Sequence, residues 1–190
     1  MSRHGAHSLQ RPRRVVVMGV SGCGKSSLGK AIGHRLQIDY IDGDDYHPQA
    51  NIDKMAGGEP LTDADRHGWL AALAELIGAR RAADASLLIG CSALKRIYRE
   101  QLRRADPDLV FLFLDGDYRL ILERMRARAH FFSPAMLDSQ FATLERPRPD
   151  EAIRVDIDAA FDTVVERCAQ ALCGQAPDGR RDSAYSEHTR

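Results

Sequence analysis

One glycine-rich stretch constrains this chain more than any other part of its sequence. Residues 19–26 read GVSGCGKS and match the pattern G-x-x-x-x-G-K-[ST] in full. The apolar run at residues 15–18 predicts a buried strand before it, and apolar residues recur at helical spacing over residues 28–36 after it. In this context backbone N–H groups cradle a phosphate. The predicted phosphate-binding residues are Gly19, Val20, Ser21, Gly22, Cys23, Gly24, Lys25, Ser26 and Ser27.

A chance match to this pattern is improbable for a chain of this composition. The sequence contains 15 Gly, 4 Lys and 15 Ser plus Thr among 190 residues. These frequencies predict roughly two matches per thousand such chains, even before the flanking strand and helix are required. The motif therefore indicates nucleotide phosphate binding, with Lys25 reaching the terminal phosphates and the Ser26 hydroxyl ligating Mg²⁺.

Composition narrows the class of protein. A chain of 190 residues that is 44% hydrophobic predicts one globular domain, and a net charge of zero gives no electrostatic case for nucleic acid or anionic membrane as a partner. The four cysteines lack zinc or disulfide spacing, which favours a reducing, cytoplasmic compartment. No stretch is long and apolar enough to span a membrane. Residues 1–13 and 174–190 are polar and aperiodic, so we expect disordered ends around a domain at residues 14–173.

Hydrophobic patterns predict an α/β fold. Four more strands are expected after the first, at residues 38–42, 86–91, 109–114 and 153–157, and helical patterns lie between them. A capping box at Thr62 opens a long helix, and Asp158 is expected to cap the last helix. The alternation predicts a five-stranded parallel sheet with helices on both faces. The phosphate loop and the loops at residues 42–47 and 91–95 should then meet at one edge, together with an arginine-rich segment.

Carboxylates crowd the turn after the second strand. Asp42 and Asp44 lie one strand–helix unit beyond the phosphate loop, which suits Mg²⁺ handling and activation of a substrate hydroxyl. Taken alone, such a turn is more often a helix N-cap. The preceding phosphate loop reverses that preference.

Basic residues supply the third group of candidates. Arg66 lies in the first turn of a helix, where the dipole disfavours a cation, so it either faces solvent or meets an anionic substrate group. Arg124 and Arg128 share one helix face next to two phenylalanines, which suggests a mobile phosphate clamp rather than a solvated charged face.

Beyond the phosphate loop, further motifs resemble those of the bacterial-type gluconokinases. They read DGDDYHP at 42–48, NIDKM at 51–55, GEPL at 58–61, DRHGWL at 65–70, CSALKRIYR at 91–99, HFF at 130–132 and SQFATLE at 139–145. The resemblance covers residues 15–158. It implies the three-layer P-loop kinase fold of the shikimate and nucleoside-monophosphate kinases, with a small helical lid at about residues 124–144. It also implies ATP-dependent phosphorylation of D-gluconate at its 6-hydroxyl.

Roles for individual residues follow from this likeness and from phosphoryl-transfer chemistry. We assign the phosphates to Lys25, Mg²⁺ to Ser26 and Asp42, and the proton of the 6-hydroxyl to Asp44. Charge on the transferring group is assigned to Arg124 and Arg128. The substrate carboxylate is assigned to Arg66 first, with Lys95 and Arg99 as alternatives. Hydroxyl contacts are expected from His47, His130 and Gln140, although a single histidine is as often structural.

One departure and several alternatives stay open at this point. A single residue separates Arg128 from His130, one fewer than in the family pattern and without its glycine, which predicts a stiffer lid that relies on Arg124 more than on Arg128. The alternatives are a shikimate or nucleotide kinase of the same fold, or a nucleotide-binding regulatory module without turnover. A homodimer is compatible with the sequence but is not specified by it.

Overall fold

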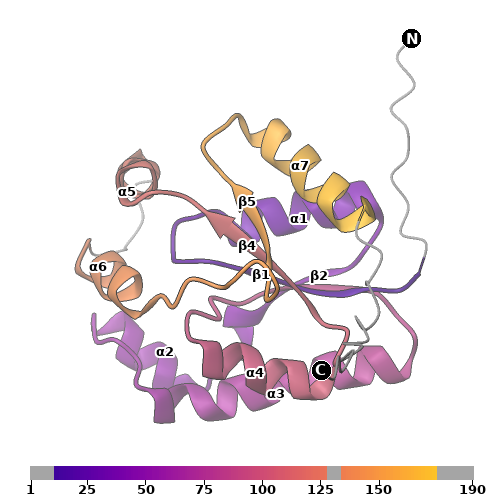
Figure 1. The fold of residues 1–190 in the computed structure, drawn as a ribbon. Coiled ribbons are helices and arrows are strands. Elements are labelled where there is room, and N and C mark those ends of the chain that lie inside the picture. The colour runs from indigo at the N-terminus through magenta and orange to yellow at the C-terminus, as the bar shows by residue number, and fades with distance from the viewer. Residues whose placement is uncertain (1–10, 128–133, 175–190) are drawn as a thin grey trace, which may run out of the picture.

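The structure, a computed structural model, describes residues 11–127 and 134–174. Within these ranges the chain forms five strands and eight helical segments (Figure 1). In order they are β1 Arg14–Met18, α1 Lys25–Leu36, β2 Tyr40–Asp42, the 3₁₀ helix η1 Gly43–Tyr46, α2 Gln49–Ala56, α3 Asp63–Ala82, β3 Leu87–Gly90, α4 Arg96–Ala105, β4 Val110–Asp115, α5 Tyr118–Ala127, α6 Pro134–Thr143, β5 Ile153–Asp156 and α7 Phe161–Gly174.

The strands form one parallel sheet in the order β2-β3-β1-β4-β5. The predicted five-stranded parallel sheet is therefore confirmed. After β1 the chain forms β2 and β3 on one side of β1, and then β4 and β5 on the other side. The direction in which strands are added to the sheet therefore reverses at β1. In such a sheet the loops at the carboxyl ends of the strands around this reversal form the binding crevice. The phosphate loop follows β1 and so lies at this reversal.

Two hydrophobic layers cover the two faces of the sheet. Along β1, Val15 and Val17 belong to the layer that includes α1 and α7, whereas Val16 and Met18 belong to the layer that includes α3 and α4. This alternation is the two-residue period of a strand, and both faces are apolar because helices cover both. Figure 1 shows α1 and α7 on one side of the sheet and α3 and α4 on the other.

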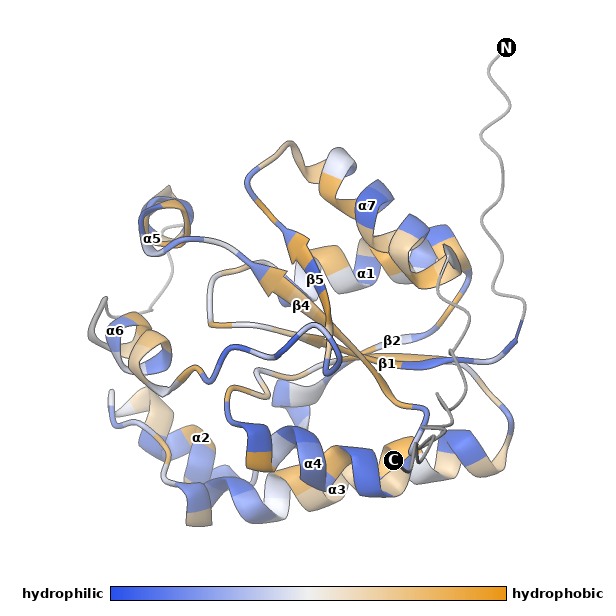
Figure 2. Ribbon diagram, in the orientation of Figure 1, coloured by the Kyte–Doolittle hydropathy of each residue, from blue (hydrophilic) through white to orange (hydrophobic). Residues whose placement is uncertain are grey.

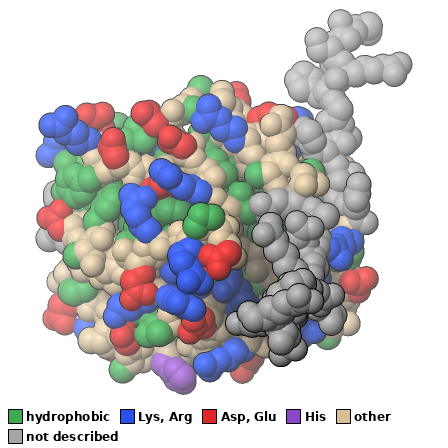
Figure 3. Space-filling model, in the orientation of Figure 1, with side chains coloured by type: hydrophobic (Ala, Val, Ile, Leu, Met, Phe, Trp, Pro, Cys, Tyr) green, Lys and Arg blue, Asp and Glu red, His purple; other side chains and the backbone are tan. Residues whose placement is uncertain are grey.

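The surface is mixed in charge. Figure 2 shows mostly hydrophobic colour on the strands, whereas the helices carry both hydrophobic and hydrophilic residues. Figure 3 shows Lys or Arg side chains interspersed with Asp or Glu on the visible face, in keeping with a net charge of zero. Within the described residues, no helix is long and apolar enough to cross a membrane.

The starts of α3 and α7 test the two helix caps predicted from the sequence. The capping box is confirmed, since the Thr62 hydroxyl accepts from the Asp65 N–H and the Asp65 carboxylate accepts from the Thr62 N–H. The cap predicted at Asp158 is wrong. Helix α7 begins at Phe161, and the Asp158 N–H instead donates to the Asp156 carboxylate in the turn after β5. The expectation of disordered ends falls largely on residues outside the described ranges.

Candidate active site

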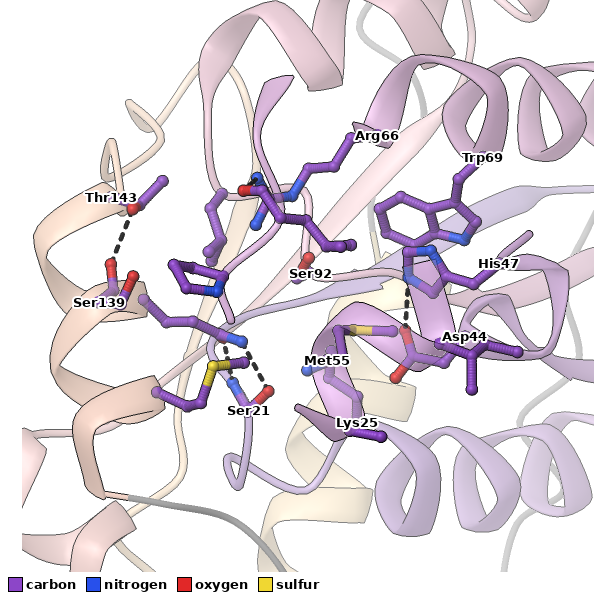
Figure 4. A pocket seen from close by; sticks show the side chains of 17 residues that line it. Ser21, Lys25, Asp44, His47, Met55, Arg66, Trp69, Ser92, Ser139 and Thr143 are labelled. Carbon is purple, nitrogen blue, oxygen red and sulfur yellow. Dashed lines mark hydrogen bonds and ion pairs between the residues drawn. The ribbon is translucent and has the colours of Figure 1, made fainter. Parts of the chain in front are cut away.

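A cavity lies at the carboxyl edge of the sheet, beside the phosphate loop (Figure 4). Its volume is about 590 Å³. Four parts of the chain line it: the phosphate loop, residues 44–69, the loop after β3, and α6. Residues predicted for the site that line it are Ser21, Lys25, Asp44, His47, Arg66 and Gln140.

The phosphate loop presents backbone N–H groups and one lysine. Helix α1 begins directly after Gly24, which has φ 99° and provides no side-chain cap, so its first N–H groups remain available to an anion. Gly22 also has a positive φ of 80°, and a Cβ there would lie 2.6 Å from Cγ of Met125. Lys25 folds back over the loop, and its Nζ donates to the carbonyls of Gly19 and Val20, each at 3.1 Å.

Two oxygen groups suited to Mg²⁺ lie side by side at the start of α1. The Ser26 hydroxyl donates to the Asp42 carboxylate at 2.6 Å. Mg²⁺ prefers one or two such protein oxygens together with waters and substrate phosphates. The pair predicted from the sequence therefore fits this ion.

Asp44 and His47 form one wall of the cavity. The Asp44 side chain is 66% accessible, yet the surrounding cavity walls desolvate its carboxylate and raise its pKa above the ordinary value, an effect that Lys25 partly opposes. His47 is buried and stacks on Trp69, with ring centroids 4.1 Å apart. Burial lowers the pKa of His47; the nearby Asp44 carboxylate opposes this shift, and the positive charge of Arg66 adds to it. We therefore expect His47 to be neutral at neutral pH.

Arg66 lines the cavity, and its guanidinium donates hydrogen bonds only to backbone carbonyls among the described residues. Its Nη1 donates to the carbonyls of Leu61 and Thr62. Its guanidinium also lies over the Tyr98 ring, 5.7 Å from the centroid. No carboxylate within the described part of the chain pairs with it. The guanidinium thus remains available to an anion that enters the cavity.

The other two candidates for a carboxylate contact do not line the cavity. Lys95 Nζ is bound to both oxygens of Asp63, at 2.7 and 2.8 Å. Arg99 is 1% exposed, and its Nη1 donates to the carbonyls of Ala93 and Leu94 at 3.1 Å each. Ala93 has φ 45°, a costly backbone conformation for a non-glycine residue, so Arg99 stabilises the loop after β3.

Gln140 connects the cavity to the phosphate loop. Its side-chain oxygen accepts from the Ser21 N–H at 2.6 Å, and its nitrogen donates to the Ser21 hydroxyl at 2.8 Å. Figure 4 shows this pair of contacts between α6 and the loop. The sequence placed Gln140 on the substrate only, and this second contact had no signal in it.

Arg124 lies on the other side of the phosphate loop. It lines a smaller cavity of about 180 Å³ together with Gly22, Ser27 and Phe161. Its Nη2 donates to the Ile157 carbonyl at 2.8 Å, in the loop between β5 and α7. Sequence reasoning missed the contribution of this loop and of Phe161 at the start of α7, whose side chain is 47% exposed. That exposure is visible only in the structure, so the sequence carried no signal for it. Arg128 and His130 lie outside the described residues.

Comparison with known proteins identifies the family. The family model for shikimate kinase matches residues 21–148. The thermosensitive and thermoresistant gluconokinases of Escherichia coli K12 are 46% and 47% identical to the chain over 160 residues, which is 83% of this chain and 86% and 91% of theirs. The chain belongs to the gluconokinase family. The family predicted from the motifs is thereby confirmed.

Solved structures of kinases agree with the fold. A crystal structure of a gluconokinase from Sinorhizobium meliloti 1021 is 43% identical, has a TM-score of 0.79 and covers 85% of this chain and 91% of its own. An APS kinase from Mycobacterium tuberculosis, at 23% identity and TM-score 0.62, shares the fold. The P-loop kinase architecture predicted for this gluconokinase family member is confirmed.

Proposed function

We propose that this protein transfers the γ-phosphoryl group of ATP to the 6-hydroxyl of D-gluconate. One observation supports this most: Lys25 and Arg66 both reach the main cavity, and neither is paired with a carboxylate among the described residues. Figure 4 draws them on opposite sides of the cavity, with Asp44 and His47 between them. A substrate that carries a carboxylate at one end and receives a phosphoryl group at the other matches this arrangement.

Among the described residues that line the main cavity, Lys25 and Arg66 are the cations without a carboxylate partner. Lys25 belongs to the phosphate loop, so Arg66 is left for the acceptor, which favours an acceptor with one negative charge. Lys95 and Arg66 both lie over the Tyr98 ring, but Asp63 neutralises Lys95. One guanidinium suits the single carboxylate of a sugar acid through a charge-assisted pair. A nucleoside monophosphate, whose phosphate carries nearly two charges, would leave part of its charge without a partner.

The residues around the reacting atoms have separate roles in phosphoryl transfer. The hydroxyl oxygen forms a bond to the γ-phosphorus as the bond from that phosphorus to the β-phosphate oxygen breaks, and the hydroxyl proton passes to Asp44. Lys25 and the loop N–H groups bind the phosphate oxygens, and Arg124 stabilises their charge from the other side of the loop. When bound by Ser26 and Asp42, Mg²⁺ would neutralise phosphate charge.

The smaller cavity supports the nucleotide end of this proposal. It lies against Gly22 and Gly24 of the phosphate loop and includes the exposed ring of Phe161. An aromatic face beside a phosphate loop provides a stacking surface for a base. We also propose a cytoplasmic location, because all four cysteines are free thiols. A homodimer stays a prediction.

A coupled ADP-release assay tests the function. Gluconate should stimulate ADP release, whereas shikimate and nucleoside monophosphates should not. Lys25→Ala should abolish turnover and leave the circular dichroism spectrum unchanged, since the lysine acts on phosphate charge and not on packing. ADP release with shikimate or a nucleotide but none with gluconate would overturn the proposal. ATP hydrolysis that does not depend on added sugar acid would favour a regulatory module.

A further inference from the structure

Asn51 is a buried amide on α2 that lies between the cavity and α3. The residue is 5% exposed. Its Nδ2 donates to the backbone carbonyl of Asp65 at 2.8 Å. The same nitrogen lies 3.3 Å from Nδ1 of His47. Because a carbonyl only accepts, the Asp65 contact fixes which end of the amide faces the histidine.

This orientation determines which nitrogen of His47 carries the proton. The Asn51 nitrogen donates, so Nδ1 of His47 must accept. A neutral imidazole that accepts at Nδ1 carries its proton on Nε2. The stack on Trp69 holds the ring plane, and the Trp69 Nε1–H in turn donates to the Gly43 carbonyl at 2.6 Å. The Nε2–H of His47 is therefore a donor held in place.

That donor faces the carboxylate assigned as proton acceptor. Nε2 of His47 lies 4.0 Å from Oδ1 of Asp44, too far for a direct hydrogen bond. A single oxygen atom placed about 2.8 Å from each of them fits this separation. A hydroxyl at that point accepts from His47 and donates its own proton to Asp44. The two side chains thus form a donor and acceptor pair for one hydroxyl.

We propose that Asn51 is a positioning residue that holds His47 as an Nε2–H donor, so that His47 and Asp44 together orient the substrate hydroxyl. With the proton on Nδ1 instead, the histidine would present a lone pair beside the carboxylate. Two acceptors would then compete for one hydroxyl proton. The hydroxyl oxygen would also lose the hydrogen bond from His47 that orients it. The identity of the hydroxyl, but not the tautomer, rests on the proposed function.

Nitrogen NMR of the histidine rings tests the tautomer directly. The full-length protein contains seven histidines, and the spectrum of His47→Phe identifies the His47 signals by their loss. At about pH 9, well above the ordinary histidine pKa of about 6.5, wild-type His47 should show the Nε2–H pattern. The Nδ1–H pattern in the wild-type protein would overturn the proposal, whether or not any variant folds.

Three variants connect the tautomer to turnover. Asn51→Asp offers an acceptor to Nδ1, so His47 should switch to the Nδ1–H form and kcat with gluconate should fall about tenfold or more, with the ATP KM changed by less than about twofold. His47→Phe keeps a ring on Trp69 but removes the donor, and should show a similar loss. The matched control is Lys54→Met. It breaks another contact between α2 and Asp65, at 2.7 Å, without touching His47, and should keep both tautomer and kcat.

The outcomes separate this inference from the proposed function. A switched tautomer in Asn51→Asp with unchanged kcat would overturn the positioning role. An equal loss of kcat in Lys54→Met would also overturn it, because loosening α2 from α3 would then explain the effect. If gluconate is not phosphorylated at all, the proposed function fails, while the wild-type spectrum still decides the tautomer.

Discussion

At the scale of single residues, two cations next to the Tyr98 ring have opposite roles. Lys95 is bound by both oxygens of Asp63, whereas Arg66 donates to backbone carbonyls at the cavity wall. Both are basic residues within motifs that resemble those of the gluconokinases, so the sequence alone could not show which of them has a carboxylate partner. The pairing with Asp63 became visible only because α3 and α4 pack together.

Substitution of these two cations should give unequal effects. Arg66→Met should raise the gluconate KM about 10- to 150-fold, because a carboxylate left without its charged partner costs about 1.5–3 kcal/mol. Lys95→Met should change that KM by less than about threefold, since its ion pair with Asp63 is solvent-accessible and outside the cavity. Steady-state kinetics with varied gluconate measures both. A larger effect from Lys95→Met would move the carboxylate away from Arg66.

Protonation of Asp44 should make kcat fall on the acid side of its pH profile, which is called the acid limb below. Desolvation raises its pKa above the ordinary aspartate value, and only the ionised form accepts a proton. The kcat should therefore fall as the pH drops through this raised pKa, at a higher pH than an ordinary aspartate would give. Asp44→Asn should lower kcat about 10²- to 10⁴-fold and remove the limb. A limb that persists unchanged in Asp44→Asn would assign it to another group.

At the scale of elements, α6 is fixed to the phosphate loop by one side chain. Gln140 makes two hydrogen bonds to Ser21 while it also lines the main cavity. Under the proposed function, helix α6 would therefore contact both substrates. The motif SQFATLE predicted a helix at this position but could not show which helix face meets the loop, because that depends on the path of the chain before α6.

Removal of this connection should affect both substrates. Gln140→Leu should raise the KM for ATP and for gluconate, by a combined factor of about 5- to 150-fold for two neutral hydrogen bonds. Ser21→Ala removes only the bond to the hydroxyl and should have the smaller effect. Parallel titrations of the two substrates measure this. If only the gluconate KM changes, Gln140 acts on the acid and its contact with the loop is incidental.

At the scale of the whole molecule, the packing of α1 on the sheet depends on a glycine. A Cβ on Gly29 would lie 2.2 Å from the Tyr40 ring. Gly29→Ala should lower the free energy of unfolding by about 1–3 kcal/mol through overpacking. Gly78 of α3 has no neighbour within 4 Å of such a Cβ, so Gly78→Ala should raise it by about 0.5–1 kcal/mol. Urea denaturation compares them, and equal changes of one sign would contradict the packing argument.

The predictions from sequence were accurate where the signal is local. Residues 15–18 and 109–114 are apolar on both faces, and the strands β1 and β4 lie there within one residue. Asp158 looked like a cap because it precedes an apolar helix, but the turn after β5 continues through Ala160 and α7 begins only at Phe161. Arg99 resembled a ligand for an anion and instead supports Ala93, and Asn51 gave no sign of its role. These roles depend on contacts between distant segments, which local patterns do not encode.

The order of the strands also bears on how copies of this chain meet one another. The sheet ends in β2, of three residues, and β5, of four. In β5, Arg154 and Asp156 alternate with more buried residues and are exposed. Short outer strands that carry charge are poor templates for a strand from a second molecule. We therefore expect this sheet to resist growth by edge-to-edge aggregation, and any association of two copies to use the helical layers.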